Sequence, residues 1–152
     1  ALPISKGDCF HEHVAPFPGA LMHPESLKIT KIDPGHPFRF AKEEAEVLEN
    51  LEKLLAEVMD KEGCHKAILV GHNPQFDLNF LQQAYARVQM EASFHAFTTF
   101  DTATLGAVFF GQTVLARAVA ASGLSFDASQ AHSALYDAER TASFFCRILN
   151  KV

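Results

Sequence analysis

Two hydrophobic patterns dominate the middle of this chain. In residues 42–61 apolar side chains recur every three to four positions and acidic side chains occupy the opposite face, which predicts an amphipathic helix. Residues 66–71 instead have an unbroken apolar centre, which is typical of a central, buried strand. Gly63 stands between them, where a left-handed cap would end the helix. A helix followed by a buried strand is therefore expected here.

The rest of the chain predicts more helices than strands. Pro24 suits the first turn of a short helix, and Asp101 or Thr102 is expected to cap another. Further helices are expected at residues 24–31, 76–89, 102–110, 113–122 and 133–150, and short strands at residues 9–14 and 97–100. These elements predict one layered α/β domain. Its sheet is small for so many helices, which suggests that part of the sheet is missing.

Composition and charge narrow the class of protein. Apolar residues make up 48% of the chain and charged residues 20%, which argues against disorder, and no apolar run has the length of a membrane span. The net charge of −5 argues against binding of long duplex nucleic acid, but it is neutral toward an enzyme that holds only a few nucleotides. The three cysteines are scattered without metal-ligand spacing, which favours reduced thiols in a cytoplasmic protein.

Two aspartates and one histidine are the candidate chemical groups. Asp77 follows the expected buried strand, and Asp137 lies in the first turns of the last helix, five residues after His132. A carboxylate near a helix N-terminus is often only structural, because the helix dipole favours it there. Two carboxylates and an imidazole at the ends of separate elements nevertheless suit metal-assisted hydrolysis of a phosphodiester. The carboxylates would hold Mg²⁺ or Mn²⁺ while the imidazole activates water.

Four short segments resemble one family of nucleases. Residues 72–77 (HNPQFD) and 132–137 (HSALYD) closely resemble the second and third motifs of the DEDDh 3′→5′ exonucleases. Residues 96–103 (AFTTFDTA) and 111–116 (GQTVLA) resemble the ribonuclease T family within that superfamily. The similarity covers residues 10–150, essentially the whole chain.

The resemblance implies a ribonuclease H-like exonuclease fold, with a mixed central sheet flanked by helices. It also implies removal of nucleotides from the single-stranded 3′ ends of tRNA, rRNA precursors and other stable RNAs, with single-stranded DNA as a further possible substrate. Asp77 and Asp137 would bind two Mg²⁺ ions, for which Mn²⁺ can substitute, and His132 would be the general base. The family acts as a homodimer, so a second copy of the chain is an expected partner.

Three further residues match substrate-binding positions of the family. Phe76 and Phe97 would stack on the terminal bases, an interaction worth about 1–3 kcal/mol per base. Glu25 would contact the terminal base and help to reject cytosine. Four residues later the family tends to carry another aromatic side chain, but this chain has Ile29. The base discrimination of the family therefore does not transfer directly.

The first motif of the family, Asp-x-Glu on the opening strand, has no counterpart after an apolar strand in this sequence. One Asp-x-Glu runs from Asp60 to Glu62, at the end of an acidic helix. The chain resembles the C-terminal three quarters of the family domain, which leaves two explanations. We favour the explanation that the sequence is an incomplete record of a complete enzyme. These residues alone would then be inactive. The alternative is a catalytically incomplete RNA-end-binding or assembly module.

Overall fold

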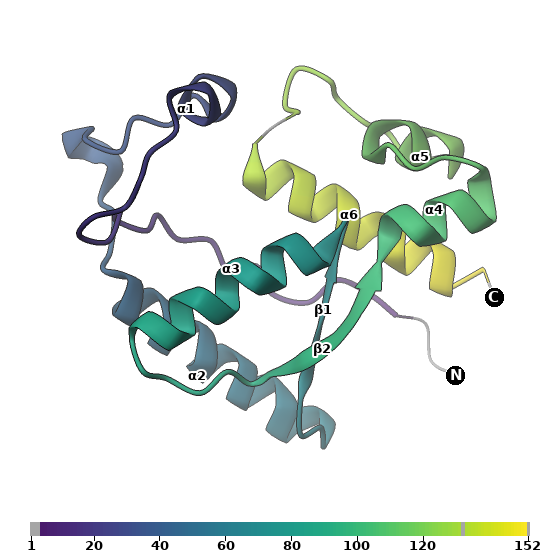
Figure 1. Ribbon diagram of the computed structural model, residues 1–152. Coiled ribbons are helices and arrows are strands. Elements are labelled where there is room, and N and C mark those ends of the chain that lie inside the picture. The colour runs from purple at the N-terminus through teal and green to yellow at the C-terminus, as the bar shows by residue number, and fades with distance from the viewer. Residues whose placement is uncertain (1–3, 132, 152) are drawn as a thin grey trace. The chain divides into compact units, whose positions relative to one another are not determined.

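The structure, a computed structural model, describes residues 4–131 and 133–151, which fold into two compact units (Figure 1). The first unit contains the described residues of 1–9, 68–80 and 95–152, and the second contains residues 10–67 and 81–94. The elements are α1 (Pro24–Thr30), a short 3-10 helix (Pro37–Arg39), α2 (Glu44–Glu62), β1 (Ala67–Gly71), α3 (Pro74–Arg87), β2 (Phe94–Asp101), α4 (Thr102–Phe110), α5 (Leu115–Ala121) and α6 (Ala134–Leu149). The expected α/β class is confirmed.

Strands β1 and β2 form a two-stranded sheet, and helix α3 connects them. At their beginnings, the backbone N–H of Ala67 donates to the carbonyl of Ser93 at 3.0 Å. At their ends, the hydroxyl of Thr102 donates to the carbonyl of Gly71 at 3.0 Å. Because beginning meets beginning and end meets end, the strands run parallel. A parallel pair requires a crossover, and α3 supplies it.

Two expectations about strands are wrong. Among the described residues β1 pairs only with β2, and Ile68 in its centre is 40% exposed, so β1 is not a strand buried on both sides. Residues 9–14 form no strand and make one isolated parallel bridge, between Val14 and Lys42. Alternating polarity alone does not produce a strand, because the backbone groups also need a ladder of partners.

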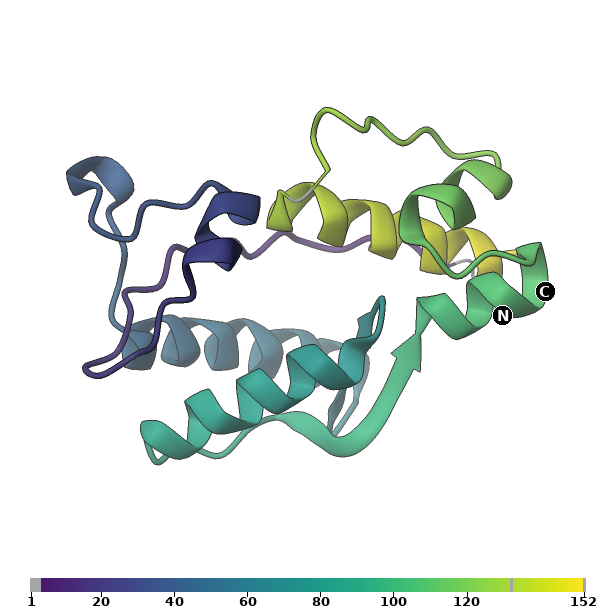
Figure 2. The ribbon, with the colours of Figure 1, turned by 45° about the horizontal axis from the view of Figure 1, so that its top comes forward.

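The core of the first unit lies among α4, α5 and α6, which pack together in the views of Figures 1 and 2. Ala118, Val119 and Phe144 are fully buried there, and Ile148 is 1% exposed. Helix α4 approaches closely at Gly106, where an added Cβ would lie 2.6 Å from the carbonyl oxygen of Gln112. Glycine is therefore required on this face of α4.

We expect Gly106→Ala to lower the free energy of unfolding by about 1–3 kcal/mol, because the new methyl group overpacks a rigid backbone contact. Urea denaturation of the full-length protein measures this change. Gly35→Ala is the matched control, because its Cβ would meet only the Asp33 carboxylate at an ordinary 3.6 Å. Equal midpoints for the two variants would contradict the packing at Gly106.

In the second unit, polar side chains connect α2 to the last turns of α3 and to the residue before β2. The hydroxyls of Tyr85 and Ser93 each donate to the carboxylate of Glu52 at 2.5 Å. Partial burial favours the neutral acid, but the bonds from Ser93 and Tyr85 and the charge of Lys66 outweigh it and lower the pKa of Glu52. Burial and the bond to Glu52 raise the pKa of Tyr85. Glu52 therefore stays ionised and fixes both partners.

No single helix in the described part of the chain is long and apolar enough to cross a membrane. Helices α4 and α5 reach the necessary length and apolar composition only when they are taken together, and the axis of this pair bends by 44° between them.

Candidate active site

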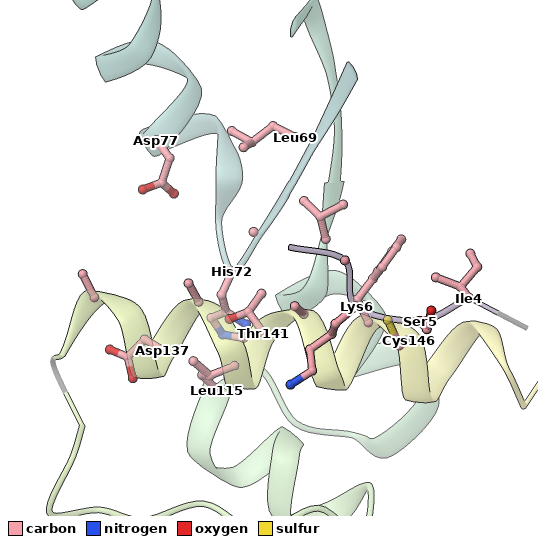
Figure 3. Close-up of a pocket in the computed structure, with 17 residues that line it drawn as sticks. Ile4, Ser5, Lys6, Leu69, His72, Asp77, Leu115, Asp137, Thr141 and Cys146 are labelled. Atoms are coloured by element: carbon pink, nitrogen blue, oxygen red, sulfur yellow. The ribbon is translucent and has the colours of Figure 1, made fainter. Parts of the chain in front are cut away.

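A cavity of about 760 Å³ lies within the first unit (Figure 3). Its walls come from β1, the first turn of α3, α6 and the segment at residues 4–7. Most of the wall is apolar, with contributions from Leu69, Val70, Leu115, Ala138, Ala142 and Phe145. Asp77 and Asp137 also line this cavity, and Figure 3 shows them at one end of it, with Ile4 and Cys146 at the other. Two carboxylates that are far apart in sequence therefore share one space.

The turn between β1 and α3 places Asp77. Gly71 ends the strand, and a Cβ there would lie 2.9 Å from the Cβ of Pro74, so only glycine allows so tight a turn. Asn73 takes a left-handed conformation (φ 67°), and its N–H donates to the carboxylate of Asp101 at 3.0 Å. Pro74 then starts α3, and Asp77 falls in its first turn, where the helix dipole favours a carboxylate.

The carboxyl group of Asp77 is partly desolvated. Burial raises the pKa of Asp77, against a smaller opposing effect of its own backbone N–H. A partly buried carboxylate is costly for the fold, and a cation of opposite charge would relieve that cost. The environment of Asp77 is therefore compatible with a cation ligand as well as with a structural role at the helix N-terminus.

We expect Asp77→Asn to raise the thermal midpoint of the full-length protein at neutral pH in metal-free buffer. A raised pKa in the folded state means that protonation stabilises the fold below the ordinary carboxyl pKa of about 3.9, and that this stabilisation is lost as pH rises. The advantage of the uncharged amide should therefore shrink as pH falls toward 4. Asp60→Asn, at the end of α2, serves as the control. A midpoint lowered at neutral pH would contradict the desolvation of Asp77.

Helix α6 carries Asp137 into the cavity. Its N–H donates to the carbonyl of Ser133 at 2.9 Å, which fixes the first turn of the helix. Thr141 follows one turn later and is buried, and both residues line the cavity. Phe144, between the cavity-facing positions, packs into the core of the first unit. This packing sets the rotation of α6 about its axis, and with it the direction of Asp137.

Asp101 caps α4, as the sequence predicted. Its carboxylate accepts from the N–H of Ala103 at 2.9 Å and from the hydroxyl of Thr104 at 2.6 Å. Burial favours the neutral acid, but these bonds and those from the backbone of Asn73 and Thr104 outweigh it and lower the pKa of Asp101. Because Asp101 also holds Asn73, the same side chain positions the start of α4 and the turn before Asp77.

His72, the first residue of the segment at 72–77, is a positioning residue whose role the sequence did not predict. Its Nδ1 lies 3.0 Å from the hydroxyl of Thr102, and its Nε2 lies 2.7 Å from the carbonyl oxygen of Thr113. A carbonyl only accepts, so Nε2 carries a proton. His72 thus ties the end of β1 to α4 and to the connection before α5, and it lines the cavity itself. Its place directly after the strand-ending glycine was the available signal.

The structure places the other predicted site residues as follows. Phe76 and Phe97 belong to the first unit, are 60% and 77% exposed, and are not among the residues that line the cavity. The Phe76 ring lies 4.8 Å from that of Phe80, and the Phe97 ring meets His95 edge-on at 4.6 Å. Glu25 is exposed in the first turn of α1, in the second unit. His132 lies outside the described residues.

The oxygen donors of the cavity form only part of a metal site. Within residues 4–131 and 133–151 no group of three or more His, Cys, Asp or Glu side chains could hold an ion. The two aspartates of the cavity supply oxygen ligands, which suit Mg²⁺, Ca²⁺ or Mn²⁺ rather than softer metals. Asp77 and Asp137 therefore fit a hard divalent cation as part of its ligand set. The pair His11 and His13, with rings 5.2 Å apart, has no third ligand among the described residues.

A carboxylate that follows the first strand of a parallel pair and a second carboxylate from the last helix thus line one cavity, and their oxygen atoms are ligands that suit a hard divalent cation. Comparison with protein families agrees, because a family model described as an exonuclease matches residues 4–145. The chain belongs to this exonuclease family, RNase_T.

Within that family the chain is similar to ribonuclease T from several bacteria. It is 48% identical over 145 residues to ribonuclease T of Buchnera aphidicola subsp. Cinara cedri, which is 95% of this chain and 66% of that protein. The identity to ribonuclease T of Cronobacter sakazakii is 44% over 149 residues, covering 97% and 67% of the two chains. With ribonuclease T of Escherichia coli O9:H4 it is 46% over 142 residues, covering 93% and 66%. The chain thus spans about two thirds of the length of these relatives.

Proposed function

We propose that this chain belongs to a metal-dependent 3′→5′ exoribonuclease that trims the single-stranded 3′ ends of tRNA and other stable RNAs. One observation carries the proposal: Asp77 and Asp137, from separate helices, line one cavity of the first unit. Membership of the exonuclease family and the similarity to ribonuclease T support the same reading.

In the proposed site Asp77 and Asp137 hold Mg²⁺ ions, two per site, and Mn²⁺ can replace them. The bound ions supply positive charge that offsets the charge developing on the phosphate oxygens. The chain itself supplies the two carboxylates and the largely apolar wall of the cavity. In this proposal it also supplies the imidazole of His132. His132 accepts the proton of the attacking water, a transfer that suits a group titrating near neutrality.

Exposed aromatic rings bind the end of the substrate in this proposal. Phe76 and Phe97 are exposed and would stack on unpaired bases, and such stacking does not depend on sequence. Glu25 contacts the terminal base. The substrate is an RNA with a free single-stranded 3′ end, such as the tRNA CCA end or an rRNA precursor, and single-stranded DNA is a second candidate.

We also propose a homodimer in the cytoplasm. The net charge of −5 leaves little basic surface on one copy for a polyanion, and a second copy could add to it. Cys9 and Cys64 are exposed free thiols and Cys146 is a partly buried one, as suits a reducing compartment.

The second candidate is a module that binds RNA ends without cutting them. It is favoured by the number of ligands, because the described residues bring only two carboxylates into the cavity. The full-length protein, incubated with 5′-labelled single-stranded RNA and Mg²⁺, separates the two proposals. Stepwise shortening from the 3′ end that stops on addition of EDTA supports the enzyme. Binding without shortening in Mg²⁺ and in Mn²⁺ supports the module.

A further inference from the structure

The junction of β2 and α4 holds the turn between β1 and α3 through one buried hydroxyl. Thr102, the first residue of α4, is a fully buried polar residue of the first unit. Its hydroxyl donates to the carbonyl of Gly71 at 3.0 Å and lies 3.0 Å from Nδ1 of His72. One side chain therefore contacts the last residue of β1 and the residue that follows it.

The residue before Thr102 holds the next position of the same turn. The carboxylate of Asp101 accepts from the backbone N–H of Asn73 at 3.0 Å. On the other side of the imidazole ring, Nε2 of His72 lies 2.7 Å from the carbonyl oxygen of Thr113. Two consecutive residues at the junction of β2 and α4 thus hold three consecutive residues at the end of β1 and in the turn.

The turn carries this arrangement on to Asp77. The carbonyl of Asn73 accepts from the N–H of Phe76 at 3.2 Å, which joins the turn to the first turn of α3. His72 and Asp77 both line the cavity that Asp137 enters from α6 (Figure 3). A shift of the turn would therefore move one carboxylate of the cavity relative to the other.

We propose that Thr102 is a positioning residue for the metal site: its hydroxyl fixes the turn before α3 and thereby sets the position of Asp77 relative to Asp137. This inference rests on the proposed function, in which the two aspartates hold the metal ions. Thr102 is fully buried and is not among the residues that line the cavity, so it acts through the turn and not by contact with metal or RNA. A misplaced ligand weakens metal binding and slows the reaction even when substrate binding is intact.

The test combines Mn²⁺ titration by calorimetry with rates on single-stranded RNA, both in the full-length protein. Thr102→Val keeps the shape of the side chain and removes the hydroxyl. We expect it to lower Mn²⁺ affinity and kcat about 10-fold each with KM unchanged, an effect typical of groups that orient metal ligands. Thr102→Ser keeps the hydroxyl and should retain both wild-type values. Thr102→Cys, whose thiol is a weak hydrogen-bonding group, should lose affinity and rate in the same direction as the valine variant.

Ser122→Ala is the matched control. Ser122, at the end of α5 in the same unit, is 2% exposed, and its hydroxyl donates to the carbonyl of Val119 at 2.6 Å. Its thermal midpoint should fall as that of Thr102→Val does, because both variants lose a buried hydroxyl that bonds a carbonyl. Its Mn²⁺ affinity and kcat should stay at the wild-type values. Equal losses of affinity in Thr102→Val and Ser122→Ala, or wild-type affinity in Thr102→Val and Thr102→Cys, would overturn the inference.

The metal titration separates this inference from the proposed function. A wild-type protein that binds Mn²⁺ without shortening RNA would contradict the enzyme. Lower affinity in Thr102→Val than in Ser122→Ala would then still support the positioning role, and equal affinity would overturn it. A wild-type protein that binds no Mn²⁺ would overturn both, because the two aspartates would hold no ion for Thr102 to serve.

Discussion

Replacing His132 with alanine in the full-length protein is expected to lower kcat on single-stranded RNA by about 10²–10⁴-fold, the usual contribution of a general base. KM should change little, because the aromatic rings proposed to bind the substrate, Phe76 and Phe97, remain. The pH–rate profile should lose its acid limb, since the imidazole no longer has to be neutral for the reaction. Single-turnover assays with 5′-labelled RNA measure both effects.

The control for this prediction is His65→Ala, which removes an exposed imidazole of the second unit. It should leave kcat and the pH profile unchanged. Added imidazole should partly restore the rate of the His132 variant and have no effect on the control. A His132 variant with a near-normal rate would remove His132 from the mechanism.

Replacing Asp137 with asparagine is expected to lower both the affinity for Mn²⁺ and the rate on RNA by at least about 100-fold. Loss of a group that only hydrogen-bonds to a metal ligand already lowers affinity or activity by up to about 100-fold, so loss of a ligand should have at least that effect. The amide keeps the size of the side chain but removes the charge that holds a cation. Mn²⁺ titration by calorimetry measures the affinity directly in the full-length protein.

Asp60→Asn is the matched control for the metal prediction. Asp60 belongs to an Asp-x-Glu that the structure places at the exposed C-terminal end of α2 in the second unit. Its replacement should leave Mn²⁺ affinity unchanged. Equal losses in the Asp60 and Asp137 variants would mean that Mn²⁺ binds acidic surface in general, and that the cavity holds no specific site.

The helices were predictable from sequence because their signals are local. The amphipathic pattern of residues 42–61 corresponds to helix α2, which ends at Gly63 in a left-handed conformation. Asp101 caps helix α4, as expected. Packing was harder to predict. Leu78 in α3 and Phe144 in α6 are buried, and the sequence does not single them out, because burial depends on which neighbouring element packs against each helix. The strand expected at residues 9–14 does not form for a related reason, because a strand also needs a neighbouring strand to pair with, and its own sequence does not identify that neighbour.

The candidate site was predictable only in part. Asp77 and Asp137 were identified from their motifs, and the structure brings both to one cavity. The ties that hold them were not predictable. His72 contacts the hydroxyl of Thr102 and the carbonyl of Thr113, which lies 41 residues away. Such contacts follow from the chain path and leave no local pattern. The roles of Glu25, Phe76, Phe97 and His132 stay predictions.

The central claim is that Asp77 and Asp137 bind divalent metal ions together. The most direct test is anomalous scattering from Mn²⁺-soaked crystals of the full-length protein. We expect an anomalous peak within coordination distance of both carboxylates, about 2.0–2.6 Å, and its loss in the Asp77→Asn, Asp137→Asn double variant. Full Mn²⁺ occupancy elsewhere, with none at these two side chains, would contradict the account.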